Sequence, residues 1–180
     1  MDLSMALSRI LPPRLLAGFT LAAAIALPLA SAAIWLFWDQ LAPYSTDPAA
    51  RYYDATSLGA AGRISGFALF FTGALIQAYG LLGLRRTFLE AAAGRTFSLA
   101  SVYGFRRFAR ISLFMAAFGV IQRTGLILIL SMSDPARQNA LSIQIGTPEL
   151  KAMFMGVLLV FVAQIFAQAK AAKDENDAFV

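Results

Sequence analysis

Four long apolar segments divide the chain, and each has the length of a helix that crosses a membrane. A transmembrane helix needs about 20 consecutive, mostly apolar residues, and lipid requires the backbone polar groups to be satisfied within the segment. The pattern therefore predicts an all-α, polytopic membrane protein, a single four-span domain folded as a four-helix transmembrane bundle. The predicted helices cover residues 15–38, 64–84, 108–132 and 150–169.

Polar segments connect the predicted helices at alternating membrane surfaces. Two of them are outer loops, over residues 39–62 and 133–149. A hairpin over 85–107 and a tail over 170–180 lie at the other surface.

Small residues repeat along the predicted helices and indicate where they pack, because helices in lipid associate through close contact at small side chains. In the second helix, Gly66, Gly73 and Gly80 recur every seven residues, and Gln77 shares their face. The third helix carries a matching stripe at Ser112, Ala116, Gly119 and Arg123, and the fourth carries one at Gly156, Ala163 and Gln164.

Composition and charge agree with a membrane location. The 180 residues are 59% hydrophobic and only 14% charged, too apolar for a soluble domain of this size. The net charge of +5 comes from residues at the ends of the apolar segments, so direct nucleic-acid binding is not expected. By the positive-inside rule, both termini and the hairpin are cytoplasmic. The residues on the predicted inner side are Arg9, Arg14, Arg85, Arg86, Arg95, Arg106, Arg107, Arg110, Lys170 and Lys173, against Arg51, Arg63, Arg137 and Lys151 outside.

The first apolar segment has two interpretations. Its basic start and the small residues at 30–32 are typical of a cleaved signal peptide. The run continues to Trp38, which is longer than such peptides need and favours a retained helix. Trp35, Trp38 and Tyr44 then predict an aromatic belt that anchors the helix at the membrane interface.

Arg123 is the single charged residue within the apolar core of the third segment. Because the four windows contain no Asp or Glu, an ion pair is not expected. The proline at Pro28 frees the carbonyl of Ala24 at a similar depth, so we expect Arg123 to donate there, with Thr72 and Ser31 as further partners. Three roles for Arg123 remain open. It is a structural peg that fixes helix packing, or part of a water-filled or anion-binding site with Gln77 and Gln164, or a side chain that extends through lipid toward water.

The usual signatures of catalysis are missing. The sequence contains no Cys and no His, which removes thiol chemistry and the common zinc and haem ligands. It has no phosphate-binding loop, metalloprotease motif, nucleophile elbow or dinucleotide fingerprint. Asp39, Asp47 and Asp54 are scattered in a loop and are expected to be solvated. The sequence therefore predicts no enzyme, no cofactor and no catalytic or metal site.

Two stretches resemble a known family. In the hairpin AAAGRTFSLASVYGFRRFAR, Gly94 is placed to end one helix and Ser98 to cap the next. This hairpin and the tail AKAAKDENDAFV are similar to the bacterial DUF2975 family, small four-helix membrane proteins of unassigned function, although Thr96 replaces the usual small residue or proline. The matching positions are Gly94, Phe97, Ser98, Glu175, Asn176, Asp177 and Val180.

The resemblance implies a bacterial inner membrane and a cytoplasmic partner such as a helix-turn-helix regulator. The acidic tail either docks on the basic hairpin of the same chain or engages a soluble protein. We therefore expect a non-catalytic regulatory or interaction module, and the alternative is a small transporter or a binder of lipophilic or anionic ligands at Arg123. The charged residues of the docked alternative are Asp174, Glu175 and Asp177 with Arg95, Arg106 or Arg107.

Overall fold

The computed structural model describes residues 12–44, 58–133 and 146–178, and this part of the chain is helical, without strands. Four of its helices are apolar and long enough to cross a membrane, which confirms the predicted all-α class with four helices able to span. A short helix and a 3-10 turn follow the first of them. The elements are α2 (Pro13–Leu36), α3 (Trp38–Leu41), η1 (Ala42–Tyr44), α5 (Ala60–Ala92), α6 (Leu99–Ser133) and α7 (Thr147–Ala178).

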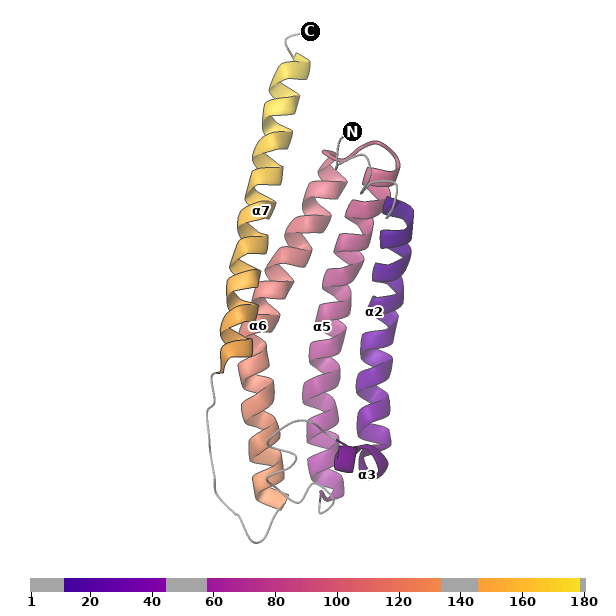
Figure 1. The fold of residues 1–180 in the computed structure, drawn as a ribbon, viewed down its shortest axis with the longest axis vertical. Helices are drawn as coiled ribbons and strands as arrows, with labels where there is room; N and C mark the ends of the chain where they lie inside the picture. The colour runs from indigo at the N-terminus through magenta and orange to yellow at the C-terminus, as the bar shows by residue number, and fades with distance from the viewer. Residues whose placement is uncertain (1–11, 45–57, 134–145, 179–180) are drawn as a thin grey trace.

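The long helices pack in the order of the sequence. α5 contacts α2 on one side and α6 on the other, and α7 packs on α6. Figure 1 shows that α2 and α7 flank the central pair, and that α7 begins part-way along α6 and projects beyond the other helices. The start of α2, the α5–α6 turn and the end of α7 lie at one end of the molecule, called the arginine-rich end below. α3 lies at the opposite end.

The predicted glycine stripe of α5 does face other helices, but the groups that pack against its glycines are side chains of those helices. Gly73 and Gly80 face α6, where a Cβ atom would collide with Gln122 and Ile111. Gly66 faces α2, where the ring of Trp35 occupies the place of a Cβ atom. The small residues therefore make room for bulky partners at these three positions.

The backbones of α5 and α6 come into direct contact nearer to the arginine-rich end, where the two helices cross at Gly83 and Gly104. A Cβ atom on Gly104 would lie 2.5 Å from the carbonyl oxygen of Gly83. Next to the crossing, the buried hydroxyl of Thr87 donates to the carbonyl of Ser101 at 2.9 Å. This contact was not part of the predicted stripe.

A buried hydrophobic cluster lies at the opposite end and contains both tryptophans. Trp35 and Trp38 are each only 6% exposed and stack with ring centroids 4.7 Å apart. They pack with Leu126, Ile127 and Leu130 of α6. Both rings therefore pack within the protein and do not form the exposed part of the predicted interfacial belt, whereas Tyr44 is exposed.

Two ion pairs fix helix ends. Asp39 accepts two hydrogen bonds from Arg63 and so joins α3 to the start of α5, whereas Asp47 and Asp54 lie outside the described residues. At the arginine-rich end, Glu90 in the last turn of α5 accepts a hydrogen bond from Arg95 of the α5–α6 turn at 3.0 Å.

Candidate functional site

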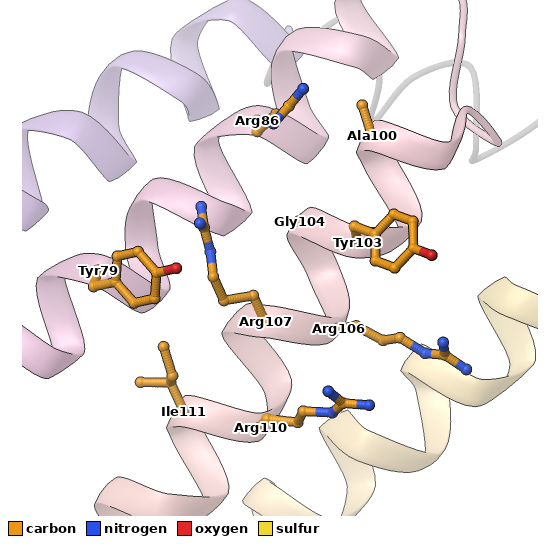
Figure 2. Close-up of a pocket in the computed structure, with 9 residues that line it drawn as sticks. All are labelled: Tyr79, Arg86, Ala100, Tyr103, Gly104, Arg106, Arg107, Arg110 and Ile111. Carbon is orange, nitrogen blue, oxygen red and sulfur yellow. The ribbon is translucent and has the colours of Figure 1, made fainter.

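A cavity of about 460 Å³ lies between α5 and α6 at the arginine-rich end. It is unusual because four arginines and two tyrosines gather at it, and Figure 2 shows how they lie. Its lining consists of Tyr79, Arg86, Ala100, Tyr103, Gly104, Arg106, Arg107, Arg110 and Ile111.

Helical spacing brings these side chains together. Positions three, four and seven apart lie on one side of a helix, and α6 places Tyr103, Arg106, Arg107 and Arg110 at that spacing. Figure 2 shows Arg107 reaching toward α5, whereas Arg106 and Arg110 reach toward α7. The arginines therefore spread over the whole surface between α5 and α7.

Arg107 is the most constrained of the four. Its guanidinium carbon lies 4.4 Å from the centroid of the Tyr79 ring, within the range of a cation–π contact. Gly83 makes room for it, because a Cβ atom there would lie 2.8 Å from Nε of Arg107. That Nε atom is buried and has no hydrogen-bond partner among the described residues. The described part of the fold thus holds a cation in place without a counter-ion.

The four arginines share this lack of a counter-ion. Within the described residues, the ion pairs are those of Arg63, Arg95, Arg123 and Lys170, and none involves an arginine of the cavity. Uncompensated positive charge in a partly enclosed site focuses an attractive field on anions. The arrangement can therefore bind a multiply charged oxyanion, since guanidinium groups match phosphate geometry.

Gln164 belongs to this end of the molecule. A smaller hollow of about 80 Å³ between α6 and α7 is lined by Gln164 together with Arg106 and Arg110. Ala163 beside it is buried, and Gly156 lies against Leu113 of α6, so the predicted stripe of α7 does face a helix. Gln164 is nevertheless separated from Arg123, which lies toward the far end of α6.

Arg123 forms an ion pair that the sequence analysis did not expect. Its Nη1 atom donates to Oε1 of Glu149 at 2.8 Å, and the other carboxylate oxygen accepts the backbone N–H of Gly146 at 2.8 Å. The expectation of carbonyl partners near Pro28 is wrong, because Arg123 reaches to α7. α7 begins at Thr147 and so includes Glu149, just before the apolar window.

The remaining residues of the predicted intramembrane site do not converge on Arg123. Thr72 is exposed and Pro28 is half-buried within α2. Gln77 and Ser31 line a different cavity with the tryptophans. Of the predicted α6 stripe, Ala116 is buried, but a Cβ atom at Gly119 would touch nothing within 4 Å.

The hairpin residues have clear structural roles. Gly94 adopts φ 75°, a left-handed conformation that suits glycine after a helix. Ser98 caps α6 by accepting the N–H of Ser101 at 3.1 Å. The ring of Phe97 lies 5.8 Å from that of Phe166, which ties the hairpin to α7.

The tail residues within the described part of the chain continue α7 as a helix. Asp174 pairs with Lys170 one turn earlier, at 2.6 Å, so the prediction that it pairs with the hairpin arginines is wrong. Glu175 and Asn176 are exposed, Asp177 lies in the last turn, and Val180 lies outside the described residues. The described tail thus leaves the hairpin uncovered.

The fold defines an all-helical protein with four helices able to span a membrane, and its most distinctive site is the arginine cavity, whose arginines have no counter-ion among the described residues. Comparison with protein-family models, with curated proteins and with solved structures finds no match. The similarity to the DUF2975 family therefore stays a prediction from the two quoted motifs. The described residues hold no cluster of three or more His, Cys, Asp or Glu side chains that could bind a metal ion.

Proposed function

We propose that this protein is a non-catalytic membrane protein that binds a phosphate-bearing anion in the arginine cavity, on the cytoplasmic side of a bacterial inner membrane. The observation that carries the proposal is that Arg86, Arg106, Arg107 and Arg110 line one cavity without a carboxylate partner among the described residues.

Several physical arguments support it. The positive-inside rule favours a cytoplasmic location for the arginine-rich end. Basic pockets between helices at that surface suit anionic lipid headgroups, and each arginine there contributes about 1 kcal/mol of attraction. The apolar stems and the two tyrosines provide a partly apolar rim that suits a ligand at the membrane interface.

The test measures binding of two probes that share the phosphate group. Purified protein in phosphatidylcholine nanodiscs is titrated with short-chain phosphatidylglycerol and, separately, with glycerol 3-phosphate, and bound species are counted by native mass spectrometry. Retention of the lipid alone identifies a headgroup site, and retention of both identifies a site for soluble phosphates. We expect Arg107→Gln to weaken binding about fivefold, and the triple Arg106, Arg107 and Arg110 to Gln variant about a hundredfold, from roughly 1 kcal/mol per arginine.

Arg14→Gln is the matched control, because Arg14 is exposed at the same end and does not line the cavity. It should bind both probes as the unmodified protein does. Circular dichroism and size-exclusion chromatography establish that the variants are folded. A triple variant that is folded and binds with unchanged affinity would contradict the proposed site.

A second candidate function is recruitment of a cytoplasmic protein, for instance a helix-turn-helix regulator. It is favoured by the projection of α7 beyond its neighbours and by the exposed Glu175 and Asn176. Deletion of residues 174–180 separates the two functions. It should abolish recruitment while leaving phosphate binding at the arginine cavity unchanged.

A further inference from the structure

A second cavity, also of about 460 Å³, lies between α2, α5 and α6, away from the arginines. Its volume is within the usual range of small-molecule sites. The lining is largely aromatic and apolar, with a few polar groups, the composition that such sites usually have. The residues that matter below are Ser31, Trp35, Trp38, Phe70, Gln77 and Gln122.

Flat rings form part of the lining. Trp35 and Trp38 are nearly parallel, with 10° between their planes, and the ring of Phe70 lies 5.7 Å from that of Trp35. Two further lining residues, Leu27 and Ile34, are 41% and 46% exposed on the outer surface of α2. The cavity therefore opens toward the surface that faces lipid, so a ligand dissolved in the bilayer can enter from the side.

The polar groups at this cavity are poorly satisfied by the protein itself. The hydroxyl oxygen of Ser31 is buried and has no hydrogen-bond partner in the part of the chain that the structure describes. The side chain of Gln122 donates to the carbonyl of Leu69 only at 3.4 Å, and the half-buried Gln77 makes no side-chain hydrogen bond within the described residues. Because polar groups in a membrane interior are costly when unpaired, these three groups suit a ligand that carries hydrogen-bonding atoms.

We propose that this cavity binds a lipid-soluble planar ring that carries carbonyl or hydroxyl oxygens, the chemistry of a membrane quinone headgroup. The ring packs against Trp35 and Phe70, and its oxygens accept hydrogen bonds from the amide of Gln77 and the hydroxyl of Ser31. The apolar tail leaves past Leu27 into the bilayer. A plain acyl chain would fill the volume but leave the polar groups unpaired.

Tryptophan fluorescence tests this directly, because both tryptophans of the protein line the cavity. Protein in phosphatidylcholine nanodiscs is titrated with decylubiquinone. We expect quenching that saturates, and binding that is about tenfold weaker in Gln77→Leu and severalfold weaker in Ser31→Ala. The serine variant changes little side-chain volume, so it provides the test if Gln77→Leu folds poorly. Gln164→Leu is the matched control, since that glutamine is exposed on α7 and lies outside the cavity; it should bind normally.

In a second experiment, the nanodisc lipid is replaced with one that has brominated acyl chains. The bromine atoms quench tryptophan fluorescence on contact. At saturating decylubiquinone, the fluorescence should no longer differ between brominated and unbrominated lipid, because the bound ring displaces the acyl chain from the cavity. Quenching by the quinone that rises linearly and equally in all variants would overturn the proposal. So would a difference in fluorescence between the two lipids that saturating quinone leaves unchanged, because the cavity would then still hold an acyl chain.

Discussion

At the scale of single residues, Arg123 illustrates how a charge is accommodated in an apolar helix. Its partner Glu149 is 12% exposed, and the pair links the half of α6 away from the arginine-rich end to the first turn of α7. Removal of either group leaves the other charge without its counter-ion in a half-buried site, and this is costly. The geometry supports the interpretation of Arg123 as a structural peg.

We therefore predict that Arg123→Leu and Glu149→Gln each lower the thermal unfolding temperature in detergent by several degrees. Because they disrupt one interaction, the double variant should lose clearly less than the sum of the two shifts. Lys151→Gln, an exposed site in the same turn of α7, should leave the temperature unchanged. Strictly additive shifts would show that the pair contributes nothing to stability.

The sequence was enough to identify the unusual residues, but it was less informative about which residues they contact. Arg123 stood out, but its partner lay one residue before the apolar window, where a search limited to the windows does not reach. Trp35 and Trp38 lie at the edge of a window, and such a position looks the same whether the ring faces lipid or protein. For the arginine cavity, the spacing of Arg106, Arg107 and Arg110 was readable, but its convergence with Tyr79 depends on how α5 and α6 cross.

At the scale of helices, the closest approach of α5 and α6 is a crossing of two glycines. We predict that Gly104→Ala destabilises the protein by about 1–3 kcal/mol, because the added methyl would meet the backbone carbonyl of Gly83, which can move only if the helices separate. Gly119→Ala in the same helix is the control. It meets open space and should be neutral or stabilising by up to about 1 kcal/mol, since alanine favours helix. Denaturant unfolding in mixed micelles measures both, and equal effects would contradict the crossing.

The number and type of the helices could be predicted because apolar length and lipid leave few alternatives. The packing partner of each helix could not be predicted from the sequence. The repeat of Gly66, Gly73 and Gly80 identified a packed face of α5, yet Gly66 meets α2 whereas the other two meet α6. A periodic pattern states which residues share a face but not which helix covers it. The helices also run beyond the apolar windows, α5 to Ala92 and α7 to Ala178, because polar residues continue them.

At the scale of the whole molecule, the features on which phosphate binding or protein recruitment would depend lie at one end. The unneutralised arginine cavity, the α5–α6 turn and the projecting part of α7 all lie there, and the tryptophan cluster and Tyr44 lie toward the opposite end. Either candidate function, phosphate binding or protein recruitment, therefore requires the arginine-rich end to face the cytoplasm. The positive-inside rule predicts that orientation from the charge asymmetry alone.

Cysteine labelling measures the orientation cleanly because the natural sequence contains no cysteine. Two single-cysteine variants are compared, Ala93→Cys and Tyr44→Cys. Ala93 is exposed just after α5 at the arginine-rich end, and Tyr44 is exposed at the opposite end. In sealed cells, a membrane-impermeant maleimide should label Tyr44→Cys and should reach Ala93→Cys only after permeabilisation. The arginines held near anionic headgroups make the reverse orientation costly, by about 1 kcal/mol for each. If Ala93→Cys were labelled in sealed cells instead, the arginine cavity would face the exterior, and a cytoplasmic ligand or partner could not reach it.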